Sequence, residues 1–263
     1  MTTNYIQLVS KFNLTNPSTG GLGNLRQSLN SLPKNRILNI LEVGCNTGVS
    51  TIAIGEMFPN AKVTGIDILP AMIERSKQNL ETAIEQGLVS QENIAFEIAD
   101  AEKLPFPNES FDLVVFTGSL SFINDKTKAL IEANRVLKSS GFLHTTDYYT
   151  NIEDSLSEKV SDALGFDVRE LTDKFWIELH SEKGFEFELV ELKDANFNKV
   201  PISFRINSLK KSLNESGITI TSQEVLEMQE YLELFQANEK NVKIVNLIMR
   251  KQNLKLFSNG ASN

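Results

Sequence analysis

The stretch Leu41-Glu42-Val43-Gly44-Cys45-Asn46-Thr47-Gly48 decides the fold of this chain. An apolar run over residues 37–43 indicates a buried strand, and residues 50–58 read as a helix that Pro59 stops. Between them, Gly44 and Gly48 allow a sharp turn and let the backbone approach a ligand without a Cβ atom in the way. The stretch therefore predicts a ligand-binding turn between a strand and a helix whose first N–H groups face the ligand.

The same strand–helix rhythm continues outward from this stretch. Further strands are predicted at residues 62–68, 94–98, 111–117 and 142–147, with helices at 70–87 and 126–138. Beyond residue 147 we expect strands at 185–192 and 242–249, and helices at 153–164, 170–183, 203–215 and from Thr221 onward. This pattern predicts an α/β fold: a doubly wound, mainly parallel seven-stranded sheet whose last pair is antiparallel, with helical cap insertions.

The 263 residues are divided on this pattern into four parts. We expect an N-terminal lid segment (1–30), a ligand-binding core (31–150), the remaining core strands with a helical substrate cap (151–250) and a frayed tail (251–263). The helices after Asp147 and those between the sixth and seventh strands are expected to form the cap, which would exclude water and select the substrate.

Charge and composition restrict the partners. A formal net charge of −8 argues against a broad nucleic-acid interface, because an acidic surface repels phosphates. No stretch approaches the roughly 18 apolar residues of a membrane span, and the chain starts without an apolar run of the signal-peptide type. The single cysteine, Cys45, cannot form an internal disulfide. We expect a cytoplasmic protein with a small-molecule substrate, either monomer or homodimer.

The residues around the turn distinguish between two cofactors. A dinucleotide site needs G-x-G-x-x-G, but the second and third glycine positions hold Asn46 and Val49. Glu42, directly before the turn, would repel a pyrophosphate but suits a cationic amine. S-adenosylmethionine carries an ammonium and a sulfonium, so the charge pattern favours it over NAD.

Acidic residues also follow the next two strands. Asp67, about 20 residues beyond the turn, can accept hydrogen bonds from both ribose hydroxyls of a nucleoside. Asp100 can accept from an adenine amine, while the backbone N–H of Ala101 can reach the ring.

Together these three pieces resemble the class I S-adenosylmethionine-dependent methyltransferases, a seven-stranded, Rossmann-like family with small-molecule members. The resemblance extends over residues 37–143, including Phe111-Asp112-Leu113-Val114-Val115 and the segment 135–141. It implies that Glu42, Gly44 and Gly48 hold the amino-acid end of the cofactor, Asp67 the ribose, and Asp100 with Ala101 the adenine. The glycine pair of Ser18-Thr19-Gly20-Gly21-Leu22 is similar to one that lies near the cofactor in some members. The remaining cofactor-binding candidates are Cys45, Asn46, Ile68, Glu102 and Thr117.

The acceptor side of the site is expected at the end of the fifth strand. Asp147 and His144 are the catalytic candidates, although Asp147 could instead cap a helix and His144 could be a packed core residue. The candidates for the substrate wall are Ser119, Tyr148, Tyr149 and Trp176. With two histidines in the chain, we expect no metal site.

We therefore expect a methyltransferase (EC 2.1.1.-) that moves a methyl group to an O, N or C nucleophile of a small molecule by in-line displacement. Two alternatives stay open: a non-catalytic S-adenosylmethionine-binding module and an NAD-dependent oxidoreductase.

Overall fold

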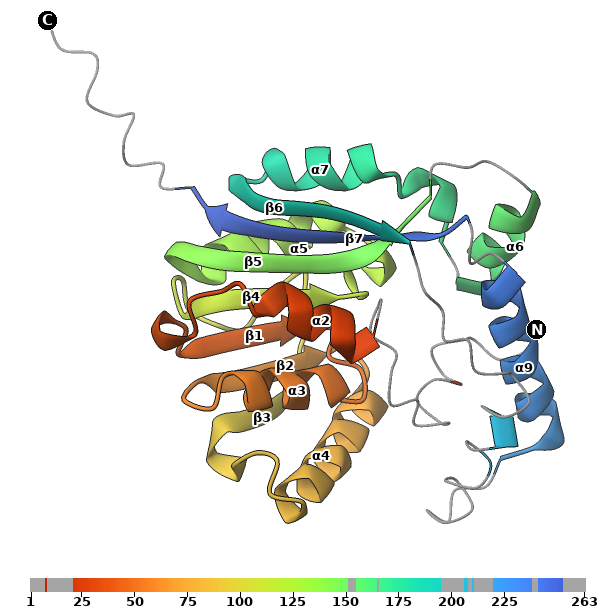
Figure 1. Ribbon diagram of the computed structural model, residues 1–263, viewed down its shortest axis with the longest axis horizontal. Helices are drawn as coiled ribbons and strands as arrows, with labels where there is room; N and C mark the ends of the chain where they lie inside the picture. The colour runs from red at the N-terminus through yellow and green to blue at the C-terminus, as the bar shows by residue number, and fades with distance from the viewer. Residues whose placement is uncertain are drawn as a thin grey trace, which may run out of the picture.

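One seven-stranded sheet organises the protein (Figure 1). The computed structural model describes residues 21–150, 155–164, 166–194, 220–237 and 241–252, with residues 8, 206, 207 and 210. The strands are β1 (Asn39–Val43), β2 (Lys62–Asp67), β3 (Ile94–Ile98), β4 (Phe111–Thr117), β5 (Leu137–Tyr149), β6 (Phe185–Asp194) and β7 (Lys243–Lys251). Their order is β3-β2-β1-β4-β5-β7-β6; β1 to β5 run parallel, and β7 is antiparallel to both β5 and β6. The predicted fold class is confirmed.

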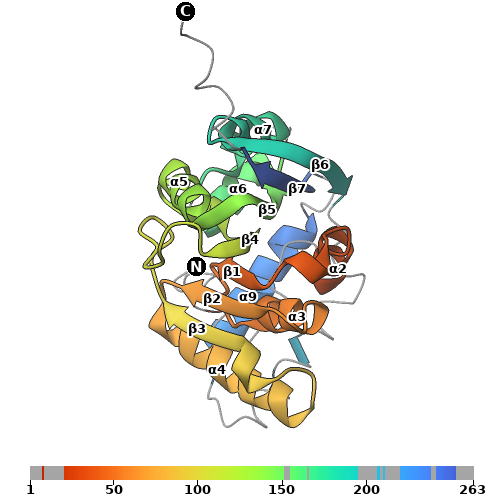
Figure 2. The same ribbon diagram turned by 90° about the vertical axis from the view of Figure 1, so that its left-hand side faces the viewer.

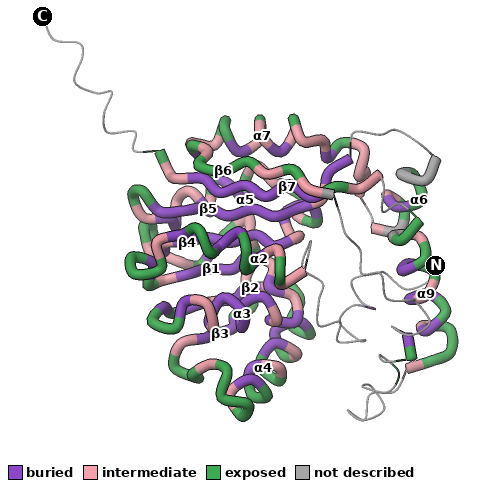
Figure 3. The backbone as a smooth tube through the Cα atoms, viewed as in Figure 1, coloured by how far each residue is buried: buried purple, intermediate pink, exposed green. Residues whose placement is uncertain are grey.

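Helices cover both faces of the sheet (Figures 1 and 2). One face carries α2 (Gly21–Leu29), α3 (Val49–Met57) and α4 (Pro70–Glu85), and the other carries α5 (Lys126–Val136) and α7 (Asp173–Ser181). Short 3-10 helices lie at η1 (Lys34–Arg36), η2 (Gln91–Asn93), η3 (Leu120–Phe122) and η4 (Val168–Glu170). Each face buries its own apolar cluster, so the central strands are buried on both sides, as Figure 3 shows.

Two elements differ from the sequence prediction. Strand β5 begins at Leu137, earlier than expected, because the helix before it ends at Val136 and Leu137 already pairs with Phe111. The helix expected over 170–183 divides into η4 and α7. Thr172 caps α7 by accepting a hydrogen bond from Phe175 N at 3.0 Å, which fixes a new helix start.

Only some of the helices expected to form the cap lie where a cap would be. Helices α6 (Ser155–Leu164) and α9 (Ser222–Ala237) lie beyond the carboxyl ends of the parallel strands (Figures 1 and 2). Helix α7 does not belong there: it is the crossover between β5 and β6 and packs on the sheet. The segment 203–215 falls largely outside the described residues.

The expected lid segment is also revised. Its part 21–29 forms α2, which buries Leu25 and Leu29 against the sheet and so belongs to the core layer. Residues 1–20, apart from the buried Leu8, and the predicted tail from residue 253 onward lie outside the described residues. Within the part of the chain that the structure describes, no helix is long and apolar enough to cross a membrane.

Candidate functional site

The turn between β1 and α3 is built mainly from backbone groups. Gly44 N and Cys45 N both donate to Ile66 O at 2.8 Å, which joins the turn to the neighbouring strand β2. Gly44 and Gly48 have φ angles of +74° and +78°, and Asn46 has +50°. Asparagine tolerates this left-handed region better than most residues do, so Asn46 can take this conformation without being glycine.

Glycine is required at position 44 for a second reason. A Cβ atom on Gly44 would lie 2.4 Å from the Cβ of Ser119, far inside van der Waals contact. Ser119 approaches this closely because its hydroxyl donates to Val43 O at 2.6 Å. Ser119, expected in the substrate wall, therefore braces the turn from the end of β4.

Two further braces were missed by the sequence analysis. On α4, Ser76 Oγ donates to Asn46 O and Asn79 Nδ2 donates to Thr47 O, both at 2.8 Å. Ser76 and Asn79 are three residues apart and so lie on one face of the helix. A polar pair at this spacing beside the apolar face was the signal in the sequence that could have identified them.

Glu42 lies fully buried beneath the turn, next to Gly65 of β2 and Val115 of β4. One carboxyl oxygen accepts a hydrogen bond from the Thr51 hydroxyl. The other, Oε1, has no hydrogen-bond partner among the residues that the structure describes. Burial raises the pKa of Glu42 to about 7, and nearby hydroxyls, Thr117 at the end of β4 among them, oppose the rise. An unpartnered buried carboxyl oxygen is costly, so it indicates a place for a donor from a ligand.

Asp67 closes β2 on the other side of the turn. Its Oδ2 accepts from Asn46 N and its Oδ1 from Leu69 N, both at 3.0 Å. Burial raises the pKa of Asp67. Burial, and after it the charges of Glu42 and Asp67, raises the pKa of the Cys45 thiol well above its usual range, so Cys45 is a packed residue and not a nucleophile.

Beyond Asp67, the sheet edge is open. Ile68 is 61% exposed and Ile98, at the end of β3, is 57% exposed. Asp100 is exposed beside them and accepts from Glu102 N at 2.8 Å, with Ala101 between the two. The Glu102 side chain points elsewhere: its Oε1 accepts from Asp125 N at 3.0 Å, at the start of α5. The structure thus brings Ile68, Asp100 and Ala101 to the edge and commits Glu102 to a helix.

Asp147 is fully buried and serves the loop after β4. Its Oδ2 accepts from Ser121 N at 3.0 Å and its Oδ1 from Tyr148 N at 2.8 Å. Burial raises its pKa to about 6. The carboxylate thus anchors η3, which begins at Leu120, and a contact between Asp147 and the substrate stays a prediction.

Three more acceptor-side candidates are core residues. His144 is fully buried on the α2 face, with its Nε2 3.2 Å from Thr146 Oγ1, and burial lowers its pKa to about 4. Trp176 is fully buried on the opposite face, where its Nε1 donates to Tyr148 O at 2.9 Å. Tyr149 belongs to the same cluster as Trp176. These burials correct their expected roles, whereas Tyr148 is partly exposed.

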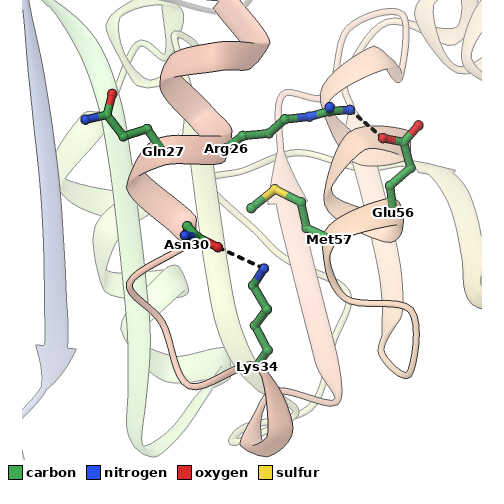
Figure 4. Close-up of a pocket in the computed structure, with 6 residues that line it drawn as sticks. All are labelled: Arg26, Gln27, Asn30, Lys34, Glu56 and Met57. Atoms are coloured by element: carbon green, nitrogen blue, oxygen red, sulfur yellow. Dashed lines mark hydrogen bonds and ion pairs between the residues drawn. The ribbon is translucent and has the colours of Figure 1, made fainter.

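Of the glycine pair before the core, the structure describes Gly21. Gly21 opens α2 with a φ of +76°, and Gly20 lies outside the described residues. A hollow of about 460 Å³ lies between α2 and α3 near the far ends of these helices (Figure 4). It is lined by Arg26, Gln27, Asn30, Lys34, Glu56 and Met57. Because Met57 ends α3 whereas the glycine turn starts it, this hollow is separate from the candidate site.

Known proteins are similar to this chain in sequence and in fold. Residues 41–145 match the family described as "Methyltransferase domain". A demethylmenaquinone methyltransferase from Staphylococcus aureus is 40% identical over 104 residues, which is 39% of this chain and 40% of that protein. A ubiquinone/menaquinone biosynthesis C-methyltransferase from Proteus mirabilis is 32% identical over 130 residues, 49% of each chain. The chain spans about half the length of the curated relatives it matches.

A solved structure extends the similarity to nearly the whole chain. Phosphoethanolamine N-methyltransferase 2 from Haemonchus contortus has a TM-score of 0.70 at 16% identity, covering 94% of this chain and 57% of that one. At this identity the likeness concerns the fold. The matched domain, the strand order and the acidic residues beside the glycine turn agree with one another. Residues 41–145 are thus similar to a methyltransferase domain, and the strand order agrees with a class I, S-adenosylmethionine-dependent methyltransferase fold.

Proposed function

We propose that this protein transfers a methyl group from S-adenosylmethionine to a nucleophile of a small molecule. The observation that carries the proposal is Glu42: a fully buried carboxyl with one unpartnered oxygen, directly beneath a turn whose glycines leave the backbone open. Such a group fits a cationic amine and disfavours a phosphate. Among common cofactors of this fold, S-adenosylmethionine has that amine.

The residues present fit the cofactor in three parts. Glu42 and the backbone of the turn would hold the amino-acid end. Asp67 would accept from the ribose hydroxyls, since Oδ2 accepts from Asn46 N, Oδ1 accepts from Leu69 N, and a carboxylate oxygen can accept two hydrogen bonds. Asp100, the N–H of Ala101 and the exposed Ile68 would bind the adenine.

When bound, the cofactor supplies a methyl group activated by a sulfonium. The protein's task is then to align the acceptor with that carbon and to keep water out. Helices α6 and α9, at the carboxyl edge, are suited to this task. Asp147 accepts two buried backbone hydrogen bonds and His144 is fully buried in the core, so we assign no general base to β5.

The first experiment is calorimetry with S-adenosylmethionine, S-adenosylhomocysteine and NAD. We expect the first two to bind in the micromolar range and NAD not to bind, because Glu42 repels a pyrophosphate. Equal or tighter binding of NAD would reject the proposal and favour the oxidoreductase alternative.

The second experiment separates the enzyme from a non-catalytic binding module. Turnover of the cofactor is measured against a panel of O, N and C acceptors that includes quinones and phosphoethanolamine, the compounds in the relatives' names. We expect at least one acceptor to accelerate turnover, and EDTA to leave that rate unchanged. A cytoplasmic location and a small-molecule partner complete the proposal.

A further inference from the structure

A single buried amide joins three strands to helix α2. Asn246 lies in β7 among Ile244, Val245, Leu247 and Ile248, and it is fully buried. Its Nδ2 donates to Asn24 Oδ1 at 2.9 Å and to Glu191 Oε2 at 3.1 Å. Its Oδ1 accepts from Asn24 Nδ2 at 2.9 Å and from Thr146 Oγ1 at 2.8 Å. All four hydrogen-bonding positions of the amide are therefore used.

The amide lies in the row of the sheet that leads to the glycine turn. Thr117 of β4 pairs with Thr146, Thr146 with Asn246, and Asn246 with Glu191 of β6. On the other side, Val43 pairs with Phe116, so Gly44 continues the row of Thr117. Glu42 pairs with Val115 of β4, and Thr117, two residues further along the strand, faces the same side of the sheet as Val115. The hydrogen-bonded side chains extend from the amide pair to Thr146, and backbone pairing continues the row to Thr117, whose hydroxyl has no hydrogen-bond partner among the described residues.

The pair between Asn24 and Asn246 fixes helix α2 in a way that apolar packing cannot. Leu25 and Leu29 bury α2 on the sheet, but such contacts permit sliding and rotation. The two reciprocal hydrogen bonds between the side-chain amides depend on direction, so they fix both the position of α2 along the sheet and its rotation. Asn24 is three residues into α2, so the helix start at Gly21 lies about 4.5 Å further toward the carboxyl edge.

From this geometry we propose that Asn246, acting through Asn24, is a positioning residue for the cofactor site. The pair sets where α2 lies on the face of the sheet that carries Glu42, beside helix α3, which begins at the glycine turn. This inference rests on the proposed function, because the property that it controls is cofactor affinity.

The test uses Asn24→Ala, Asn246→Thr and the double variant of the full chain, with Gln27→Ala as a control. Gln27 is an exposed residue of the same helix that is outside the amide pair. Alanine favours a helix and threonine favours a strand, so neither replacement opposes its local structure. We expect each single variant to weaken S-adenosylhomocysteine binding about tenfold, and the double variant to be no more than about twofold worse than either. Gln27→Ala should bind as the wild type does.

A second measurement follows α2 itself. Amide hydrogen exchange in residues 21–29 should accelerate in Asn24→Ala and in Asn246→Thr, and stay at the wild-type rate in Gln27→Ala. The inference is wrong if binding by Asn24→Ala stays within twofold of wild type, if the two substitutions add fully, or if exchange in α2 does not change. A wild-type protein that does not bind the cofactor at all would instead reject the proposed function, and this inference with it.

Discussion

The two halves of the sheet end in different ways at the same edge. At the ends of β1 and β2, the backbone of the turn lies in the left-handed region. Two buried oxygens there, Glu42 Oε1 and Asn46 Oδ1, have no hydrogen-bond partner among the described residues. At the end of β5 and in β7, Asp147 and Asn246 are buried and hydrogen-bonded within the protein. The first half is built to gain partners from a ligand, and the second is built to hold its own elements in place. Burial of a polar residue therefore does not by itself mark a binding site, because the polar groups of Asp147 and Asn246 are buried and paired.

The largest loss of stability is expected from Gly44→Ala, a substitution in the glycine turn of the first half. The new Cβ would meet Ser119 Cβ at 2.4 Å, in a backbone conformation with a φ of +74°. Strain and overpacking together should lower the free energy of unfolding by about 4 kcal/mol. Urea unfolding measures this loss, and Gly23→Ala is the matched control, because a Cβ on Gly23 has no atom within 4 Å. A Gly44→Ala protein as stable as wild type would mean that the turn is not close-packed.

The next effect is the pH dependence that Glu42 imposes. Burial raises its pKa from 4.5 to about 7 in the folded protein. Between these values the folded state holds a proton that the unfolded chain has released, so stability falls as pH rises and levels off above about 7. The loss attributable to Glu42 should be about 3 kcal/mol in the free protein.

Glu42→Gln should abolish the fall in stability between pH 6 and 7. Asp147 contributes less to the fall in that range, because its pKa is lower, about 6. Unfolding titrations at a series of pH values measure the slope, with Glu92→Gln on the exposed η2 as a control. Saturating S-adenosylhomocysteine should flatten the wild-type slope as well, because its ammonium favours the ionised carboxyl. An equal slope in wild type and Glu42→Gln would contradict the assignment.

A smaller effect is expected from Asp67→Asn. The variant keeps one acceptor oxygen and loses the charge that strengthens bonds from ribose hydroxyls, so binding should weaken by about 2 kcal/mol, roughly thirtyfold in Kd. Calorimetry compares it with Glu102→Gln. We expect that variant to bind normally, because Glu102 bonds to Asp125 N at the start of α5. If Glu102→Gln loses as much affinity as Asp67→Asn, Glu102 contacts the cofactor as well as the start of α5.

The contrast between the halves also explains how far the sequence was informative. The strands and the turn from Ile40 to Gly48 could be predicted because glycine, strand ends and apolar periodicity depend on local backbone needs. The positions of His144 and Trp176 could not, because the side of the sheet that they face and the partners that they find depend on contacts distant in sequence. Asn246 carried a signal, a polar residue inside an apolar strand, but its partner is 222 residues away.

The smallest effect tests whether the second half is only structural. The Trp176 side chain projects from α7 into the core. Within the described part of the chain, Trp176→Phe removes one polar contact, the hydrogen bond from Nε1 to Tyr148 O. A buried hydrogen bond and a slightly smaller ring should together contribute about 1–2 kcal/mol to unfolding. Because the indole is shielded from the edge where the substrate would bind, the KM for whichever acceptor the panel identifies should stay within twofold. Steady-state kinetics at a temperature where both proteins are folded provides the comparison. A severalfold rise in KM at unchanged stability would mean that Trp176 contacts the substrate. The distinction between a ligand-binding half and a structural half of the sheet would then be wrong.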